Sequence, residues 1–346
     1  MKTIRDFDLA GKRVLVRSDF NIPLDERGNV LDDFRIARAL PTIRSLFKQK
    51  AKVIVMSHLG NPGGKVVEDL RLDFVRQSLS KYLGQQVAKA EDCVGADVEK
   101  LAMNLQKGEV LLLENLRFHK EEELNDLSFA KELASLAEVF INDAFSTSHR
   151  MHASIVGVPK LLPSLIGLLM EKEIQHLEKF SNDPSRPFVA IVGGMKVKDK
   201  LAFIDSISKT ADVVLIGNLI AEEAKTEGVV FQSPGKIVFP LDGGYDIGPR
   251  TTELFLEKLK DAKSVFWTGP LGWTSKEEYA KGSLAVAEAI IKSKAFAVAG
   301  GGNLGAFLTA KGLREKFSFV STGGGASLAF LAGEKLPGLE VLGYYG

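Results

Sequence analysis

Short apolar runs alternate with amphipathic segments along this chain of 346 residues. In the first half, the apolar runs predict strands at residues 13–17, 52–57, 110–113 and 139–142. Helical periodicity predicts helices at residues 34–48, 71–83 and 128–137, with Asp32 or Asp33 capping the first and Asp126 the last. Strands and helices that alternate in this way are typical of a parallel sheet covered by helices on both faces.

A long helical pattern at residues 163–180 ends in the polar turn SNDPSRP, where the second half begins. The alternation then predicts strands at 188–192, 212–216, 264–267, 295–299 and 317–321, and helices at 199–209, 251–260 and 277–291, with a short irregular stretch after residue 216. We therefore predict an α/β protein of two doubly wound, Rossmann-like parallel-sheet domains joined by a hinge helix. The expected bounds are 1–166 for the first domain, 167–180 for the helix and 181–327 for the second domain.

Composition and charge narrow the classes of function. An apolar content of 45% and a charged content of 26% describe a globular protein, and the net charge of +1 gives no electrostatic reason to expect nucleic-acid binding. The N-terminus lacks the apolar core of a signal peptide, and the longest apolar stretch, residues 161–170, is too short to span a bilayer. We expect a cytoplasmic protein without membrane contact.

Cysteine, histidine and glycine patterns argue against two classes of enzyme. The single cysteine, Cys93, fits a reducing compartment, and with no His or Cys nearby in the sequence it is expected to be a small, half-buried residue. The five histidines show no H-E-x-x-H pattern and no Cys/His cluster, which argues against a metal hydrolase. Gly300, Gly302 and Gly305 match a dinucleotide fingerprint, but the acid expected about 20 residues later is absent.

Three predicted strands of the second half run directly into glycines that precede a helix. The three turns contain Gly193-Gly194, Gly300-Gly301-Gly302 and Gly323-Gly324-Gly325. Such turns are expected to leave backbone N–H groups pointing outward at a helix N-terminus, where they bind phosphate. The first turn is followed by Lys196, Lys198 and Lys200, so the sequence favours a phosphate site in this half.

Cationic residues follow the predicted strands of the first half. The set comprises Arg17, Arg35, Arg117, Arg150 and His58. Any one of these arginines could simply pair with a neighbouring acid at the surface. Because the carboxyl ends of parallel strands meet at one edge of a sheet, the whole set favours a site for a small polyanion, which arginine binds through its planar fork.

A series of long motifs runs through nearly the whole chain: RSDFNIPL, DDFRIARALPTI, SHLGNP, LLLENLRFH, NDAFSTSHRMHAS, GLLMEKE, FVAIVGGMKVKDK, DIGP, WTGPLG, AKGSLAVAEAI and FVSTGGGASLAFL. In sequence and in order they resemble the phosphoglycerate kinase family. The resemblance implies a glycolytic phosphotransferase with a carboxyl group as acceptor, which transfers a phosphoryl group between 1,3-bisphosphoglycerate and ADP, giving 3-phosphoglycerate and ATP, with Mg²⁺. It also implies that the first domain binds phosphoglycerate, that the second binds nucleotide, and that residues 328–346 pack back on the first domain. A monomer is expected.

The resemblance carries over residue roles position by position. The phosphoglycerate would be held by Asp19, Phe20, Asn21, Arg35, His58, Leu59, Gly60, Asn61, Arg117 and Arg150. The transferred phosphoryl group would meet Arg35, Lys200, Gly302 and Gly324 as catalytic residues, and hinge closure would exclude water. The nucleotide would be held by Gly194, Lys196, Lys200, Ser275, Gly301, Gly302, Asn303 and Leu304.

The departures from the family pattern fall mostly in the second half. Asn303 replaces the carboxylate expected to bind magnesium, so the candidate ligand is a neutral amide oxygen, and Leu304 replaces a hydroxyl residue. Ser275 stands where a ribose-binding glutamate is expected, and Thr268 where the family has Asn. Gly217-Asn218-Leu219 replaces three glycines, and the stretch 220–246 is shorter than in the family.

On the phosphoglycerate side, the main change is Asn61 in place of an arginine. Two interpretations follow from these departures. One is an active kinase with a rearranged nucleotide site; the other is a noncatalytic relative that binds phosphoglycerate as a sensor or interaction protein. Trp267 and Trp273 are expected to fill the core, although Trp273 could instead line an altered base pocket.

Overall fold

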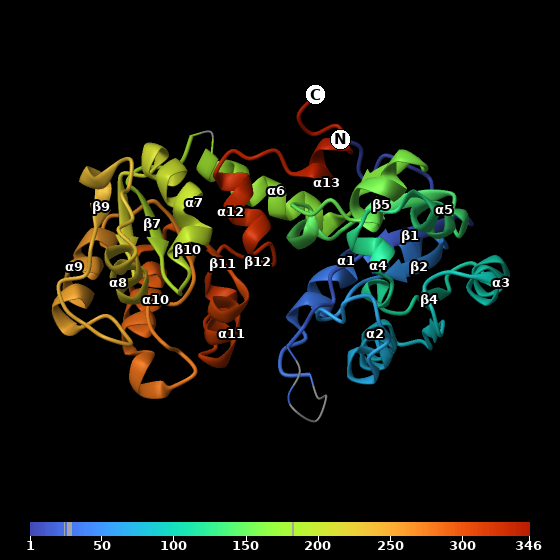
Figure 1. The fold of residues 1–346 in the computed structure, drawn as a ribbon, viewed down its shortest axis with the longest axis horizontal. Coiled ribbons are helices and arrows are strands. Elements are labelled where there is room, and N and C mark those ends of the chain that lie inside the picture. Colours follow the sequence, from blue (N-terminus) through green and yellow to red (C-terminus); the bar gives the residue numbers. More distant parts are fainter. Residues whose placement is uncertain (24, 26–29, 182) are drawn as a thin grey trace. The chain divides into compact units, whose positions relative to one another are not determined.

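The computed structural model describes residues 1–23, 25, 30–181 and 183–346, which form two compact units (Figure 1). The first unit is Met1–Lys172 with Lys335–Gly346, and the second is Glu173–Glu334. The division falls inside helix α6 (Leu168–Ser181), and residues 328–334 belong to the second unit, whereas they were expected with the first. Two residues of the quoted motifs, Leu24 in RSDFNIPL and Asn182 in SNDPSRP, lie outside the described residues.

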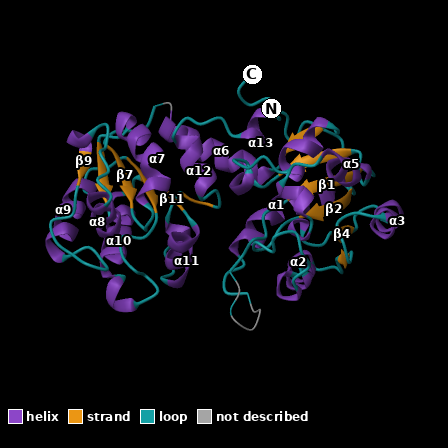
Figure 2. Ribbon diagram, viewed as in Figure 1, coloured by secondary structure: helices purple, strands orange, loops and turns teal. Residues whose placement is uncertain are grey.

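The first unit is built on a six-stranded parallel sheet with strand order β3-β4-β2-β1-β5-β6. Its strands are β1 (Arg13–Arg17), β2 (Lys52–Met56), β3 (Ala88–Lys89), β4 (Val110–Leu112), β5 (Val139–Asn142) and β6 (Ser164–Ile166). Its helices are α1 (Phe34–Lys48), α2 (Asp73–Leu83), α3 (Ala96–Asn104), α4 (Lys120–Glu123), α5 (Leu127–Ser135) and α13 (Pro337–Glu340). Figure 2 shows the helices of this unit around its strands.

Period-two alternation along the strands builds a core on each face of this sheet. In β1, Val14 and Val16 pack in one buried cluster with Ile43 of α1. Leu15 points to the opposite face and packs in a second cluster with Leu133 of α5. Burial on both faces explains why the strands are continuously apolar rather than alternating with polar residues.

The second unit repeats this plan with strand order β12-β11-β10-β7-β8-β9, again parallel. Its strands are β7 (Phe188–Val192), β8 (Val213–Ile216), β9 (Ile237–Val238), β10 (Ser264–Thr268), β11 (Phe296–Gly300) and β12 (Phe319–Ser321). Its helices are α7 (Val197–Thr210), α8 (Asn218–Thr226), α9 (Pro249–Leu259), α10 (Lys281–Ser293), α11 (Gly302–Ala310) and α12 (Gly325–Leu331). The two parallel sheets with flanking helices confirm the predicted fold class.

The predicted strands are all present, but some local predictions were wrong. Residues 164–166 form β6 rather than the start of a long helix, and the stretch after residue 216 contains α8 and β9. Strands β3, β6 and β9 have only two or three residues, too few to produce a periodic signal. Asp126 caps α5 as predicted, accepting a hydrogen bond from the backbone N–H of Phe129 at 2.9 Å.

The C-terminal segment lies against the first unit. The backbone N–H of Gly338 donates to the carbonyl of Ser148 at 2.8 Å, and a Cβ at Gly338 would lie 2.9 Å from Ser148 Cα. Only glycine allows this approach. Among the described residues, none of the helices is both long and apolar enough to cross a membrane.

Candidate active site

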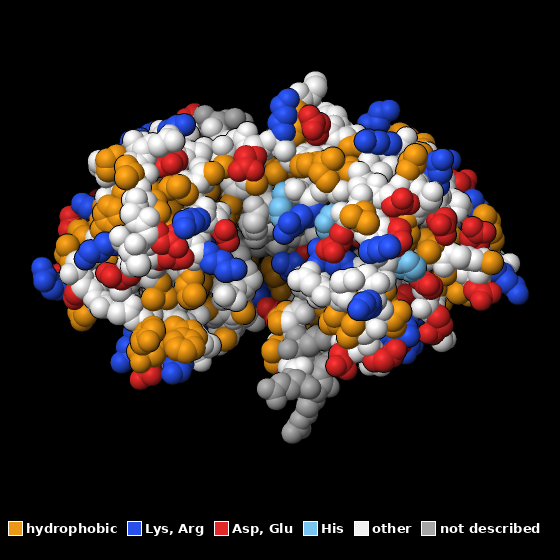
Figure 3. All heavy atoms as spheres, viewed as in Figure 1, with side chains coloured by type: hydrophobic (Ala, Val, Ile, Leu, Met, Phe, Trp, Pro, Cys, Tyr) orange, Lys and Arg blue, Asp and Glu red, His pale blue; other side chains and the backbone are white. Residues whose placement is uncertain are grey.

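The strand ends of the first unit carry a cluster of cationic and polar side chains, here called the strand-end cluster: Arg17, Asp19, Asn21, Arg35, His58, Arg117, Glu122, Arg150, His152 and Ser154. Arg17 ends β1, His58 follows β2, and Arg117 follows β4. The parallel topology therefore brings together residues far apart in the sequence. Figure 3 shows Lys and Arg side chains beside His side chains on the visible face of this unit.

Asp19 organises one side of the cluster. Its carboxylate accepts hydrogen bonds from Arg35 and from the hydroxyl of Ser146, and from the backbone N–H of Asn21 at 2.9 Å. The residue is only 7% exposed, so the ion pair holds the Arg35 guanidinium at the start of α1 in a fixed place. Asp32 supports this helix start by accepting the N–H of Phe34 at 2.9 Å.

Arg117 holds the other side of the cluster. Its Nη1 donates to the carbonyl of Gly60 at 2.8 Å and to Oδ1 of Asn61 at 2.5 Å, and its Nε lies 3.3 Å from the Glu123 carboxylate. Asn21 Oδ1 accepts the N–H of Gly60 at 2.9 Å, which joins the loops after β1 and β2. Asn61 therefore serves as a partner of Arg117.

Arg17 is the largest correction within this cluster. It was predicted to reach a polyanion, but the side chain is buried, and burial lowers the pKa of its guanidinium to about 10. Its Nε donates to Ser154 Oγ at 2.9 Å, and its Nη2 lies 3.2 Å from His58 Nδ1. Buried Glu122 faces it and accepts from the Ser154 backbone N–H at 2.9 Å. Arg17 thus positions neighbours rather than meeting a ligand.

The histidines of the cluster are neutral. Burial, together with the nearby charges of Arg17, Arg117 and Arg35, holds the pKa of His58 well below its usual range. Burial also lowers the pKa of His149 and of His152 to about 4, with Arg150 adding to both shifts. Within the described part of the chain, Nδ1 of His149 and of His152 has no hydrogen-bond partner. The site therefore combines an excess of arginine with neutral imidazoles, which suits a bound anion.

The side chains of two residues that were predicted to bind substrate are not accessible to a ligand. Phe20 and Leu59 are both buried in the core cluster of the first unit. Phe20 N–H donates to Ser57 Oγ at 2.8 Å, and Leu59 N–H donates to Asn115 Oδ1 at 3.2 Å. They shape the loops, and their side chains are not available to a ligand. Arg150, in contrast, is exposed.

The first glycine turn of the second unit is closed, contrary to prediction. The N–H of Gly193 donates to the Thr268 carbonyl at 2.8 Å, and the N–H of Gly194 donates to the Pro270 carbonyl at 2.7 Å. A Cβ at Gly193 would lie 2.2 Å from the Pro270 oxygen. These glycines allow two loops to touch, and their N–H groups are already used.

Lys200 lies over this closed turn. Its Nζ donates to the carbonyl of Met195 and would be 3.3 Å from a Cβ at Gly194, so glycine makes room for the ammonium group. Burial lowers the pKa of Lys200. Lys196 is exposed at the N-cap of α7, and Lys198 pairs with Glu227 at 3.1 Å.

The second and third glycine turns are open. A Cβ at Gly302 or at Gly324 would meet no atom within 4 Å. Within the described residues, the N–H groups of Gly302, Asn303 and Gly324 donate to no backbone or side-chain acceptor. Gly301 precedes α11 with a φ of +102°, a conformation that favours glycine. These turns match the predicted anion-binding arrangement.

Buried Glu173 of α6 fixes the third turn and was missed by sequence reasoning. Its carboxylate accepts hydrogen bonds from the Ser321 hydroxyl at 2.6 Å and from the Thr322 N–H at 2.7 Å. The only sequence signal was its place in the GLLMEKE motif. Glu122 and Ser154 were also missed, because the residues that they contact lie far away in the sequence.

Several side chains that were predicted to bind nucleotide are buried or lack a charge that could bind it. Leu304 is buried in the core, so its side chain does not reach the turn. Asn303 and Ser275 are exposed, and Glu277, close to Ser275, is paired with Lys311 Nζ at 2.6 Å. Trp267 is buried as expected, whereas Trp273 is 47% exposed and forms a patch with Tyr245 and Tyr279.

The fold is that of an α/β protein of two units, each built on a six-stranded parallel sheet, and the first unit gathers arginines at its strand ends. The family model for phosphoglycerate kinase matches residues 4–229 and 220–334 of the chain. The chain belongs to the phosphoglycerate kinase family, as the sequence resemblance predicted.

Similar proteins match nearly the whole chain. It is 44% identical over 387 residues to a phosphoglycerate kinase of Dictyoglomus turgidum, covering 98% of this chain and 97% of that protein. It is 42% identical over 388 residues to one of Pelotomaculum thermopropionicum, covering 99% and 98%. The crystal structure of phosphoglycerate kinase from Pyrococcus horikoshii OT3 superposes with a TM-score of 0.89 at 32% identity, covering 99% of this chain and 98% of that one.

Proposed function

We propose that the protein is an active phosphoglycerate kinase, which transfers a phosphoryl group reversibly between 1,3-bisphosphoglycerate and ADP. The observation that carries the proposal is the match to proteins named phosphoglycerate kinase over 98% of the chain at 44% identity. None of these comparisons supports the noncatalytic alternative. The strand-end cluster and the two open glycine turns supply what phosphoryl transfer needs, which is positioning and charge neutralisation.

In this proposal the first unit holds 3-phosphoglycerate. Arg117 and Arg150 bind its anionic groups. His58 and His152 are neutral, so they add hydrogen-bonding nitrogens without repelling the neighbouring arginines. Asp19 fixes Arg35 through their ion pair, and the guanidinium neutralises charge on the transferring group. Asn21 and Asn61 hold the loops that carry these side chains.

The second unit holds the nucleotide phosphates. The open N–H groups at Gly302 and Gly324 bind phosphate oxygens, and the Lys200 ammonium group adds positive charge. Because burial lowers the pKa of Lys200, a bound phosphate would restore the preference for its charged form. The exposed Lys196 adds a weaker, solvent-screened contribution.

Magnesium is a weaker fit to the residues of the second unit. The expected ligand position is Asn303, an exposed side chain whose oxygen is neutral, whereas Mg²⁺ prefers carboxylates and phosphates. The chain itself does not offer a magnesium site there, so the ion would be held by the nucleotide phosphates. No step of the transfer is assigned to it.

The nucleotide side is also shortened. The alignment with the Dictyoglomus turgidum protein spans 387 positions and covers 98% of this chain's 346 residues, about 339, so roughly 48 positions have no counterpart here. The family model divides its match at residues 220–229, inside the stretch expected to be short. We infer a rearranged nucleotide site in which backbone N–H groups matter more than side chains.

A coupled assay with 3-phosphoglycerate, Mg²⁺ and ATP, with GTP in parallel, tests the proposal. Turnover that disappears in Arg35→Ala would support it and exclude a contaminating host kinase. Absence of turnover with either nucleotide, in a protein that 3-phosphoglycerate still stabilises against heat, would overturn it in favour of a noncatalytic binding protein. Light scattering on the same sample would test the expected monomer.

A further inference from the structure

Three potential metal ligands meet in the first unit, away from the strand-end cluster. Asp92 and Cys93 lie in the loop between β3 and α3, and His119 lies between the turn Leu116–Phe118 and α4. One ligand atom from each of the three residues lies within 4.8 Å of the other two. The expectation that Cys93 is half-buried was wrong, because the residue is fully buried, and a ring nitrogen of His119, which is distant in the sequence, lies within 4.8 Å of its sulfur.

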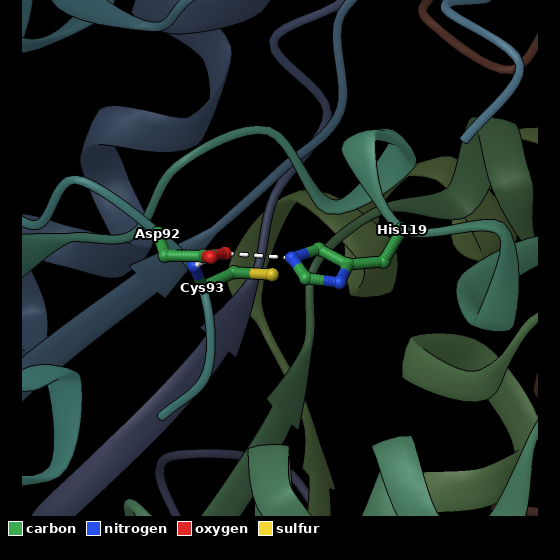
Figure 4. A group of neighbouring side chains, drawn as sticks. All are labelled: Asp92, Cys93 and His119. Atoms are coloured by element: carbon green, nitrogen blue, oxygen red, sulfur yellow. Dashed lines mark hydrogen bonds and ion pairs between the residues drawn. The ribbon is translucent and has the colours of Figure 1, made fainter. Parts of the chain in front are cut away.

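The three donors face one common point (Figure 4). Asp92 Oδ1 lies 2.6 Å from His119 Nε2, and the Cys93 sulfur lies on the same side of the imidazole as that carboxylate. The His119 ring stacks on Phe129 with centroids 5.2 Å apart, and the Asp92 carboxylate accepts the Cys93 N–H at 2.6 Å. Ring and carboxylate are thus held in orientation by contacts that a ligand would not need to break.

Because the three donor atoms face one point, the arrangement suits metal binding rather than catalysis by a cysteine nucleophile. A cysteine nucleophile needs a histidine whose two ring nitrogens serve the thiol and an orienting carboxylate separately. Here the carboxylate and the sulfur meet the same edge of the ring.

We propose that Asp92, Cys93 and His119 form a binding site for a divalent transition metal ion of the zinc class, with water as a fourth ligand. Thiolate, imidazole and carboxylate together suit Zn²⁺ and do not suit Mg²⁺ or Ca²⁺, which take oxygen ligands. Zinc bonds of about 2.0–2.3 Å in a tetrahedron place donor atoms roughly 3.3–3.6 Å apart. The Asp92–His119 pair at 2.6 Å would open by about 1 Å to reach this spacing, and the sulfur, which lies within 4.8 Å of both partners, would close on the ion by a movement of similar size.

The fourth position faces water from one side. The side chains of His119 and Asp92 are 27% and 53% exposed, whereas Cys93 is buried beneath them. An ion entering from this side would displace the thiol proton to solvent and stay bound to the thiolate. It would link the loop after β3 to the turn after β4, which carries Arg117.

Cobalt absorption tests the site directly, because Cys93 is the only cysteine of the chain. The full-length protein is freed of metal with a chelator, dialysed, and titrated with Co²⁺ and then with Zn²⁺, while calorimetry gives the stoichiometry. We expect one ion per chain and a thiolate-to-cobalt charge-transfer band that Zn²⁺ displaces. Absence of that band in the wild-type protein would overturn the proposal.

Variants separate ligation from folding. Cys93→Ser should abolish the band, and His119→Gln and Asp92→Asn, whose side chains are partly exposed, should weaken Zn²⁺ binding at least tenfold. Asp97→Asn, an exposed acid on neighbouring α3, is the matched control and should bind as the wild type does. Equal affinity in His119→Gln and in Asp97→Asn would contradict the proposed ligand set. The result does not depend on turnover, so it stands apart from the proposed kinase function.

Discussion

The two units share one fold, and in our proposal they bind phosphate in different ways. The first unit uses side chains: Asp19 and Glu122 hold two arginines in place, and buried histidines stay neutral beside them. The second unit uses backbone N–H groups at two open glycine turns, with one partly buried lysine. Recognition by side chains depends on single residues, whereas recognition by backbone N–H groups depends little on which side chain stands at positions such as Asn303 and Leu304.

The largest expected effect belongs to the side-chain unit. Arg35→Ala should lower kcat by about 10³-fold or more, because an arginine on a transferring phosphoryl group contributes roughly 10³–10⁵ in rate. The coupled assay measures it. Arg44 is an exposed arginine on the same helix, and its Nη2 donates to the Tyr82 carbonyl at 2.7 Å, so Arg44→Ala should keep turnover within about twofold. Similar losses in both variants would mean that helix α1, rather than the Arg35 charge, matters.

The closed glycine turn should matter for stability. Gly193→Ala would place a methyl group 2.2 Å from the Pro270 oxygen, so the free energy of unfolding should fall by about 3 kcal/mol. Urea unfolding measures this change. Gly302→Ala has no atom within 4 Å of the new methyl group and should not lower stability. An unchanged unfolding midpoint for Gly193→Ala would contradict the close packing of the two loops.

His152 should make the first unit sensitive to acid. Its pKa is lowered to about 4 by burial and by Arg117, Arg17 and Arg150, whereas an unfolded chain has a histidine pKa of about 6.5. The unfolded state therefore binds a proton that the folded state excludes, and stability falls as pH drops from about 6.5 towards 4, by up to about 3 kcal/mol. Urea unfolding at several pH values should show a shallower fall for His152→Gln. An equal slope would show that His152 is not held neutral.

The open turn should affect nucleotide binding. Gly302→Ala puts a methyl group beside the free N–H groups, so the KM for ATP should rise about tenfold, equivalent to about 1.4 kcal/mol. The KM for 3-phosphoglycerate should stay unchanged in the same assay. A rise in the KM for 3-phosphoglycerate as well as in the KM for ATP would contradict the proposal that each unit binds one substrate.

The smallest effect is expected at Asn303. Asn303→Asp would add a carboxylate at an exposed position, and exposed charge contacts contribute about 0.2–1 kcal/mol, so the KM for ATP with magnesium should fall by at most about fivefold. Asn303→Ala should leave the magnesium dependence unchanged. A gain of a hundredfold or more would show that the missing carboxylate, and not the backbone, limits the nucleotide site.

The sequence predicted the two sheets well because buried parallel strands are continuous apolar runs. It also placed His58 and Arg117 correctly after strand ends and Arg35 at the start of the first helix, since the parallel topology brings these positions to one edge of the sheet. It could not show that Arg17 is buried against Ser154, or that the Gly193 turn is filled by the Pro270 loop. Those outcomes depend on partners distant in the sequence, and so does the meeting of Cys93 with His119.

The central claim is that side chains of the first unit bind phosphoglycerate and backbone groups of the second bind nucleotide. Calorimetric titration of Arg117→Ala and Gly302→Ala with 3-phosphoglycerate and with ATP tests it directly. The account predicts that Arg117→Ala weakens 3-phosphoglycerate binding at least tenfold and leaves ATP binding intact, since a hydrogen-bonded charge contributes about 1.5–3 kcal/mol. Gly302→Ala should do the reverse. Loss of both ligands in either correctly folded variant, or of neither in both, would contradict the account.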